Sequence, residues 1–406
     1  MTTMSLPAAA AAQHLRERLP DRVDSVDLLR GVIMILMALD HVRDYFGAAG
    51  VDPTNPATTT VALFFTRWIT HFCAPVFFLL TGVSAFLVSQ RRSTADLSRY
   101  LLTRGLWLIV LEVTVMRCLA WQFNFDYRVT MLTVLWALGA SMVLLAGLVW
   151  LPVGAVAILA VGVILGHNVL DFVPAAALGS LAPAISVLHA PSVLFSDGTH
   201  VVFSAYPLVP WVAVVAAGYA LGGIFLWPPA RRGRFLLRLG AMLTISFVLL
   251  RIANAYGDPR PWTAFDSVVQ SGLAFLNATK YPPSLLFLLM TVGPAMLFLA
   301  AVDRKTPRSL RPALVFGRVP LFYFVLHVVL MHALAVVVCY LRYGDAHWMF
   351  ESPTLGQFPV TQPPGWPIGL PGVYLVWLSV VVMLYPLCRW FAALKARRRA
   401  WWLSYL

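Results

Sequence analysis

Charged residues are scarce in this sequence: Lys, Arg, Asp and Glu make up 12% of its 406 residues, whereas 60% are hydrophobic and the mean hydropathy is +0.79. Ordinary soluble domains carry about twice that share of charge. The composition therefore excludes an ordinary soluble domain. Repeated long apolar runs predict instead an all-α polytopic membrane protein.

Cysteines and short catalytic motifs are also few. The four cysteines form neither a disulfide framework nor a zinc-binding pattern. The sequence lacks a glycine-rich dinucleotide motif after a strand, a P-loop, a GxSxG motif and an HExxH motif. We therefore expect no tightly bound cofactor. No residues with a specific metal-ligand spacing are present either, so no metal is expected.

Ten apolar stretches are long enough to predict transmembrane helices. They cover residues 28–46, 62–88, 100–120, 130–149, 153–171, 205–227, 235–253, 283–301, 314–340 and 372–393. Residues 22–395 are interpreted as a single transmembrane domain. Residues 1–21 are interpreted as a disordered cytoplasmic tail, and residues 396–406 as a short basic and aromatic cytoplasmic tail.

The distribution of basic residues orients the predicted helices. The net charge of +13 alone would suit a nucleic-acid partner, but the basic residues lie in short loops between apolar stretches. With both termini in the cytoplasm, 22 of the 30 Lys and Arg residues fall at or near inner ends. This asymmetry obeys the positive-inside rule. The expected partners are thus the lipid bilayer and small molecules rather than nucleic acid, and the sequence leaves a homo-oligomer open.

The first predicted helix carries the most informative polar residues. At about 100° per residue, Asp27, Arg30, Met34 and His41 share one stripe. Asp27 and His41 are separated by about 21 Å of helical rise. Ionisable groups inside a membrane are costly, so they usually face a bundle interior or a wet cavity and mark function.

His41 is the leading candidate for a catalytic residue. Asp40 and Asp44 flank it and could raise its basicity, with the i+3 spacing of Asp44 better suited to contact. His71 and His327 fall at the same predicted depth and are further catalytic candidates. The alternative for each histidine is a plain hydrogen bond between helices.

Two groups of polar residues lie on either side of the predicted depth of these histidines in the membrane. On the inner side, Arg99 and Arg104 belong to a basic rim that either sets topology or binds phosphate, because guanidinium suits phosphate. Asp27 and Arg30 are either an inner-surface ion pair or an anchor for a negatively charged donor. On the outer side, the candidates for acceptor binding are Arg43, Arg67, Lys280, Tyr281 and His332. Lys280 could equally be an interface anchor, and His332 a packing residue.

Several segments together resemble a known family. They are Val26–Phe46, Phe64–Leu87, Ser98–Glu112, Thr279–Ala295 and Gly317–Ala335. The chain, over about residues 22–340, resembles the catalytic domain of heparan-alpha-glucosaminide N-acetyltransferase-like proteins in their bacterial branch. The spacing from Leu29 to His41 is also similar to the first helix of the broader transmembrane acyltransferases, which use a histidine there.

The resemblance implies acyl transfer in a bacterial cytoplasmic (inner) membrane. The implied donor is cytoplasmic acyl-CoA, with acetyl-CoA expected, and the acceptor is an extracytoplasmic amine or hydroxyl such as that of a carbohydrate. The lysosomal branch carries its candidate acetyl-accepting histidine in the loop after the first motif helix. This chain has no histidine between Gly47 and Thr70, so His41 takes the role by analogy with the broader group.

Two mechanisms and one other function remain open from the sequence. His41 could act as a general base or carry the acyl group covalently, and both need a neutral imidazole. The same buried His and Asp residues could instead relay protons in a proton-coupled small-molecule transporter. The lack of a clear inverted repeat weighs against a transporter.

The charge asymmetry generates a topology prediction. A reporter fused after Lys395 should be cytoplasmic, and one inserted within residues 254–282 should be extracytoplasmic, because inner loops retain Lys and Arg. Fusions to alkaline phosphatase and to a fluorescent protein would measure both positions. An external reporter after Lys395 would refute the ten-helix topology.

Overall fold

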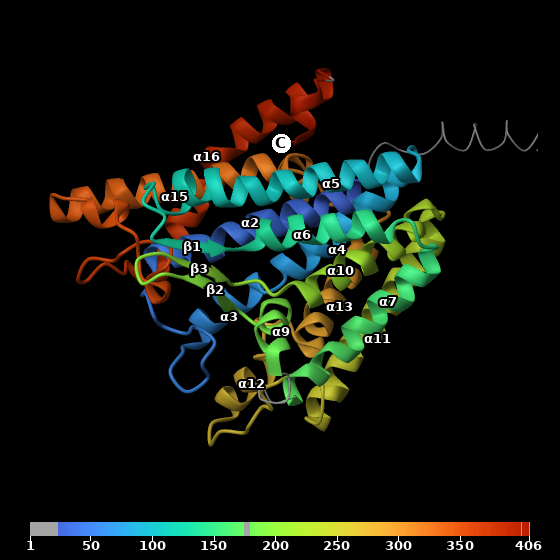
Figure 1. The fold of residues 1–406 in the computed structure, drawn as a ribbon, viewed down its shortest axis with the longest axis horizontal. Coiled ribbons are helices and arrows are strands. Elements are labelled where there is room, and N and C mark those ends of the chain that lie inside the picture. Colours follow the sequence, from blue (N-terminus) through green and yellow to red (C-terminus); the bar gives the residue numbers. More distant parts are fainter. Residues whose placement is uncertain (1–22, 174–178, 399, 406) are drawn as a thin grey trace, which may run out of the picture.

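The computed structural model describes residues 23–173, 179–398 and 400–405, and helices dominate it (Figure 1). The predicted tail at residues 1–21 lies outside the described residues. The longer helices are α2 (Asp24–Phe46), α3 (Val61–Thr70), α4 (Cys73–Ser89), α5 (Thr94–Leu111), η1 (Glu112–Trp121), α6 (Val134–Leu148), α7 (Val153–Gly166), α9 (Ala182–His189), α10 (Leu208–Leu221), α11 (Pro229–Ala253), α12 (Val268–Leu276), α13 (Leu285–Val302), α14 (Ala313–Arg318), α15 (Pro320–Tyr343) and α16 (Gly369–Arg397).

Each of the ten predicted stretches contains a helix. Within the described residues, seven helical segments are long and apolar enough to cross a membrane. They are Val61–Ser89, Val153–Phe172, Leu208–Leu226, Pro229–Ala253, Leu285–Val302, Pro320–Tyr343 and Gly369–Arg397. The chain is thus an integral membrane protein. The more charged α2 and α5 and the 15-residue α6 are not among the seven, so ten crossings and cytoplasmic termini stay predictions.

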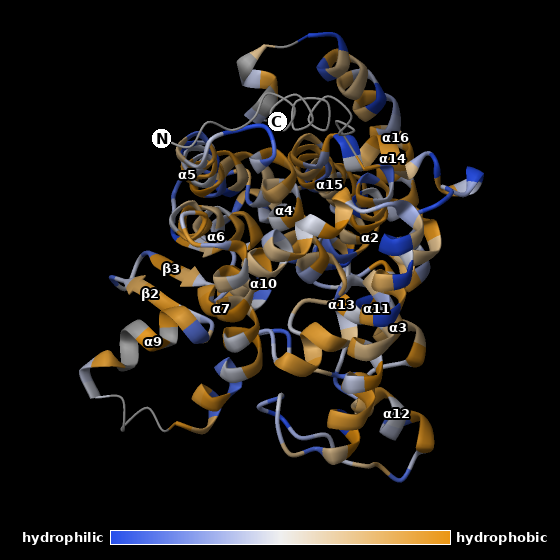
Figure 2. Cartoon of the chain, turned by 90° about the vertical axis from the view of Figure 1, so that its right-hand side faces the viewer, coloured by the Kyte–Doolittle hydropathy of each residue, from blue (hydrophilic) through white to orange (hydrophobic). Residues whose placement is uncertain are grey.

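The surface of the outlying helices supports a lipid-facing environment. Large apolar side chains such as Ile158 on α7 and Leu249 and Ile252 on α11 are exposed. The hydrophobic colour extends over the outer sides of the helices in Figure 2. Contiguous exposed apolar surface of this kind suits a hydrocarbon surrounding rather than water.

A small sheet corrects the expectation of an all-α chain. Strands β1 (Val129–Leu132), β2 (Ser192–Ser196) and β3 (Val201–Ser204) form a sheet in the order β1-β3-β2. β1 runs parallel to β3 with Val129 opposite Val201, and β2 runs antiparallel to β3. The sheet lies at the left end of α6 in Figure 1. Backbone groups of connecting segments need hydrogen-bond partners, and here they find one another.

Two predicted helices are irregular at places that matter for the site. The predicted helix 62–88 is interrupted between α3 and α4, at His71 and Phe72. The predicted helix 100–120 changes into the π-helix η1, and such geometry is often found at functional sites. The buried Glu112 at the start of η1 accepts hydrogen bonds from the backbone N–H and the hydroxyl of Thr133, at 2.7 and 2.5 Å. This contact ties η1 to the start of α6.

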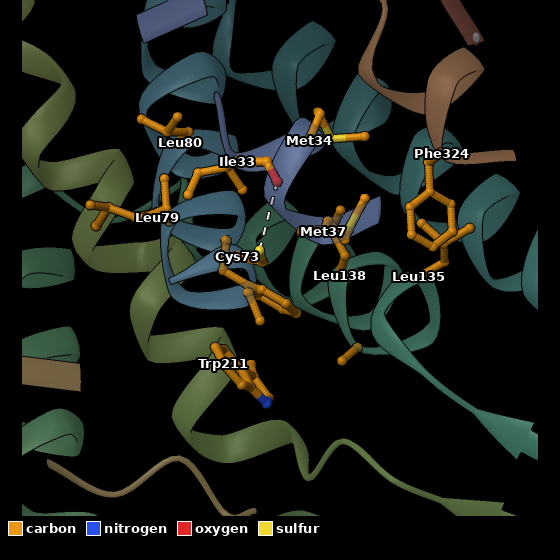
Figure 3. Close-up of a cluster of buried hydrophobic side chains, with 14 of the residues drawn as sticks. Ile33, Met34, Met37, Cys73, Leu79, Leu80, Leu135, Leu138, Trp211 and Phe324 are labelled. Atoms are coloured by element: carbon orange, nitrogen blue, oxygen red, sulfur yellow. Dashed lines mark hydrogen bonds between the residues drawn. The ribbon is translucent and has the colours of Figure 1, made fainter. Parts of the chain in front are cut away.

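Helix α2 lies at the centre of the bundle. It packs against α3, α4, α13, α14, α15 and α16. Figure 3 shows the core around it, with labelled side chains from α2 (Ile33, Met34, Met37), α4 (Cys73, Leu79, Leu80), α6 (Leu135, Leu138), α10 (Trp211) and α15 (Phe324). The helix that carries the catalytic candidates is therefore enclosed by other helices. This arrangement is expected, because exposing charged side chains to lipid is energetically costly.

Two glycines allow the backbones of α2 and α14 to touch. A Cβ added to Gly31 would lie 1.8 Å from the carbonyl oxygen of Ala313, and one added to Gly317 would lie 1.8 Å from that of Asp27. No real side chain fits at such distances. Small residues at helix contacts of this kind drive close association in membranes.

This contact predicts a strong effect of a single methyl group. Gly31→Ala should destabilise the protein by about 1–3 kcal/mol or more, because backbone atoms must separate. The measurement is thermal unfolding in detergent. Gly162→Ala in α7 is the matched control, since nothing lies within 4 Å of its added Cβ. Equal unfolding temperatures for the two variants would contradict a close α2–α14 contact.

Candidate active site

The centre of the site is a pair of hydrogen-bonded histidines. His41 on α2 and His327 on α15 lie with Nδ1 of His41 2.8 Å from Nε2 of His327. Their rings stack at 5.0 Å with an interplanar angle of 16°. The sequence separates these residues by 286 positions. Two of the histidines that the sequence places at one depth are therefore in direct contact.

A backbone carbonyl determines which nitrogen of each ring carries the proton. Nδ1 of His327 lies 3.0 Å from the carbonyl oxygen of Tyr323, one turn earlier in α15. A carbonyl only accepts, so His327 donates through Nδ1 and its Nε2 holds a lone pair. His41 must then donate through Nδ1 to that lone pair. In the neutral pair the Nε2 of His41 is left with its own lone pair, an assignment that follows from the hydrogen-bond network.

Aromatic rings surround His41. Trp121, the last residue of η1, meets the imidazole edge to face at 5.0 Å, and Phe324 of α15 does so at 6.1 Å. Tyr323 stacks on His327 at 5.1 Å. These rings restrict the orientation of both imidazoles and exclude water from most of their surface.

The acidic neighbours of His41 take a different role from the expected one. Asp40 forms an ion pair with Arg67 of α3 and a 3.2 Å hydrogen bond with Arg43. Asp44 accepts from Arg43 at 2.6 Å. Neither carboxylate is the partner of Nδ1 of His41, because that nitrogen is hydrogen-bonded to His327. The contact with His41 that was expected of Asp44 is therefore made by His327, and Asp44 is bonded to the guanidinium of Arg43 instead.

His71 is near this network but makes different contacts. It is 3% exposed and packs edge to face on Phe287 of α13 at 5.4 Å. Its Nδ1 has no hydrogen-bond partner among the described residues. The residue is therefore turned into the protein, where its ring packs on a phenylalanine.

On the predicted cytoplasmic side, α2 borders a cavity of about 360 Å³ that we call the inner cavity. Arg30 donates to Asp27 at 2.9 Å and to the hydroxyl of Ser84 on α4 at 2.8 Å. All three residues line the inner cavity, together with Arg91, Arg92 and Arg318. Asp27 and Arg30 thus form an ion pair. The pair lies in the wall of the inner cavity.

A second cavity leads from there toward the histidines. This apolar cavity of about 240 Å³ shares Arg30, Ser84 and Tyr100 with the inner cavity. Leucines from α5 and α6, including Leu138, line its sides, and Phe324 lies on its wall. Since Phe324 contacts both His41 and His327, the two cavities together approach the histidine pair from the inner side.

Arg99 and Arg104 border a third space, the basic groove, with a volume of about 570 Å³. Arg104 lies over the ring of Tyr100 at 4.3 Å and over the ring of Tyr405 at 5.1 Å. Arg104, Tyr100 and Tyr405 line the apolar cavity as well. The basic groove and the apolar cavity therefore share these three residues as walls.

On the predicted outer side, a short turn presents Lys280 and Tyr281. Lys280 is 8% exposed, and its ammonium lies 5.1 Å from the centre of the Tyr281 ring. The hydroxyl of Tyr281 donates to that of Tyr206 at 3.4 Å. Buried Asp258 accepts from Thr279 and Ser284, at the two ends of this turn. The turn is thus held rigidly by a carboxylate that the sequence analysis did not single out.

His332 does not fit the expected acceptor-side role. Its Nδ1 lies 3.0 Å from the carbonyl oxygen of Ala120 and its Nε2 lies 2.6 Å from that of Met349. It also stacks on Phe123 at 3.7 Å. Both nitrogens are engaged by the backbone, which favours the packing role that was the alternative for this residue.

The profile of the family described as "Heparan-alpha-glucosaminide N-acetyltransferase, catalytic" matches residues 22–252, which is more than half of the chain. The chain belongs to this family. No curated protein matches it. The match includes His41, Arg104 and Trp121, whereas His327 and Lys280 lie beyond its end. The family match therefore does not extend to residues 253–340, where the sequence also showed a resemblance.

Several residues of the site had no signal in the sequence. Trp121 and Phe324 are ordinary apolar residues of predicted helices, and Ser84 is one of several hydroxyls in α4. The position of His327 one turn after Tyr323 is visible in the sequence, but its pairing with His41 is a tertiary contact. Among the described residues no three His, Cys, Asp or Glu side chains are grouped as metal ligands.

Proposed function

We propose that this protein is an acyltransferase of the bacterial inner membrane. It moves an acyl group, with acetyl expected, from cytoplasmic acyl-CoA to an amine or hydroxyl of an extracytoplasmic acceptor such as a sugar. One observation carries the proposal: the His41–His327 pair leaves a lone pair on Nε2 of His41, next to the end of a cavity route from the basic inner rim. Membership of the acetyltransferase family supports the same reaction class.

The donor fits the three connected spaces by its chemistry. Its phosphates are anionic and suit the guanidinium groups of Arg99 and Arg104 in the basic groove. The methylene and methyl groups of its long pantetheine arm suit the apolar cavity, and its two amides suit the hydroxyls of Thr81 and Ser84 on the wall. The thioester then reaches Phe324, beside His41.

The chemical step uses His41 in one of two ways. As a general base, Nε2 takes the proton of the acceptor amine or hydroxyl while the acceptor attacks the thioester carbonyl. The carbon–sulfur bond breaks, and the leaving thiolate takes the proton back from the imidazolium. In the covalent alternative, Nε2 attacks the carbonyl and expels the thiolate, and the acyl group later passes to the acceptor, whose proton neutralises the thiolate. Both need the lone pair of the neutral ring.

His327 and the backbone of Tyr323 position this lone pair. The chain of hydrogen bonds from His41 through His327 to the Tyr323 carbonyl keeps the Nδ1 proton on His41. An orienting partner of this kind supports a base without replacing it. On the other side, Arg43, Arg67, Lys280 and Tyr281 are proposed to form the acceptor rim.

The two histidines should respond differently to glutamine. His41→Gln should bind CoA and lose acyl transfer by at least about 10²-fold, because an amide has no basicity near neutral pH. His327→Gln should retain more activity than His327→Leu, since an amide can accept from His41 and donate to Tyr323. For the leucine variant we expect a loss of about 10–100-fold. The assay is transfer from labelled acetyl-CoA to a panel of amino sugars and glycan hydroxyls in vesicles.

His347→Gln, an exposed outer-loop variant, is the matched control. Wild-type turnover by His41→Gln would show that the wrong residue stands at the centre of the mechanism. Equal activity of the two His327 variants would remove the orienting role. A wild-type protein that transfers nothing but changes the pH inside vesicles would favour the proton-coupled transporter.

The basic groove generates a separate binding prediction. Replacing Arg99 and Arg104 together with Gln should weaken CoA binding by about 1.5–3 kcal/mol for each lost charged contact. Titration calorimetry in detergent measures the affinity. The double variant of Arg234 and Arg238 removes the same charge from exposed positions of α11 that do not line the three spaces. Equal affinities for the two double variants would mean that Arg99 and Arg104 only orient the protein.

A further inference from the structure

The indole of Trp121 contains a hydrogen-bond donor without an acceptor. Its Nε1 is closed off from solvent and has no partner among the described residues, and the residue is 5% exposed. Leaving a buried donor unpaired costs about 1–3 kcal/mol. A folded protein rarely leaves a buried donor unpaired without a reason. One such reason is that a bound ligand supplies the acceptor.

The indole is held firmly in place. It lies parallel to the Tyr45 ring at 6.3 Å and tilted against Phe358 at 5.6 Å. The carbonyl oxygen of Trp121 accepts a 3.0 Å hydrogen bond from the hydroxyl of Tyr45. Trp121 is also the last residue of the π-helix η1. A donor fixed in this way needs no reorganisation during a reaction.

Its position distinguishes Trp121 from the other unpaired donors. The indole nitrogens of Trp136 and Trp211 are also buried without an acceptor among the described residues. Trp211 packs on Phe78 and Tyr206, whereas Trp121 contacts the imidazole of His41 at 5.0 Å. The unpaired hydroxyl of Tyr323 belongs to a ring that stacks on His327. The unpaired donor in ring contact with His41 is thus that of Trp121.

Acyl transfer is accelerated by a hydrogen-bond donor beside the carbonyl oxygen of the thioester. When a nucleophile bonds to the thioester carbonyl carbon, the carbonyl oxygen takes up the electron pair and becomes an oxyanion. The oxyanion returns the pair as the carbon–sulfur bond breaks and the thiolate leaves. Donors aimed at that oxygen commonly contribute about 10²–10³-fold to turnover. Arg43 and Arg67 already form ion pairs with Asp40 and Asp44, and although the Nε of Arg43 has no partner among the described residues, its Nη2 is held by both carboxylates.

We propose that Trp121 is a catalytic residue whose Nε1–H donates to the oxyanion formed at the acyl carbonyl beside His41. The inference rests on the acyltransferase function proposed above and holds for either mechanism of His41. It extends the site to a residue of η1, so that α2, η1 and α15 each supply one group: the base, the oxyanion donor and the orienting histidine.

The test removes the N–H while keeping the ring. Trp121→Phe, and replacement of Trp121 by 3-benzothienylalanine, in which sulfur takes the place of N–H in the same shape, should each lower kcat by about 10²–10³-fold. KM for acetyl-CoA and the affinity for CoA should stay within about twofold, because CoA lacks the acyl oxygen. Trp211→Phe is the matched control, since it also removes an unpaired buried indole N–H, and it should retain wild-type kcat.

Each outcome is decisive. Wild-type kcat in the benzothienylalanine variant would overturn the oxyanion role, because that variant preserves packing and lacks only the donor. Loss of kcat in Trp121→Phe alone, with normal benzothienylalanine activity, would assign Trp121 to packing and overturn the proposal too. If wild type transfers acyl groups in the same assay, the acyltransferase function survives either result. A wild type that transfers to no acceptor overturns both.

Discussion

The need to satisfy polar groups inside a hydrocarbon environment governs the arrangement of this protein. Three polar side chains of α2 find partners on different neighbouring helices. Arg30 reaches Ser84 of α4 and the backbone of α14, Asp40 pairs with Arg67 of α3, and His41 bonds to His327 of α15. Because unsatisfied groups are costly without water, these contacts specify which helices may surround α2 and at which depth. The glycine contact with α14 brings the inner half of that arrangement into backbone contact.

This arrangement divides α2 into two functional ends. The N-terminal end, predicted to be cytoplasmic, borders cavities lined by arginines, and the C-terminal end carries an ion-pair network next to the histidine pair. An apolar cavity connects the N-terminal end to Phe324, beside the histidines. Such a path suits a reaction whose donor and acceptor come from opposite sides of a membrane, because the two substrates need meet only at one imidazole.

The charged residues next to His41 in the sequence are not its hydrogen-bond partners in the structure. The sequence around His41 suggested an acidic residue as its partner, since Asp40 and Asp44 are adjacent in the helix. Arginines are stronger partners for carboxylates in a low-dielectric site, and two of them lie within reach. The imidazole therefore pairs with another imidazole, and a backbone carbonyl settles the tautomer of both. A pair of neutral rings keeps a basic nitrogen in an apolar cavity without adding a buried charge.

By itself, the sequence determined the properties that depend on composition and local periodicity. The membrane environment, the positions of the helices, the stripe of Asp27, Arg30 and His41, and the family membership all follow from runs of apolar residues and short motifs. The tertiary structure decided the properties that depend on contacts between distant residues: the bond from His41 to His327, the engagement of His332 by two carbonyls, the small outer sheet, and the unpaired indole of Trp121. The physical reason is that hydropathy and helical period are carried by neighbours in the chain. Which donor meets which acceptor is instead settled by how the helices pack, where strong pairs such as Arg67 with Asp40 take precedence over proximity in sequence.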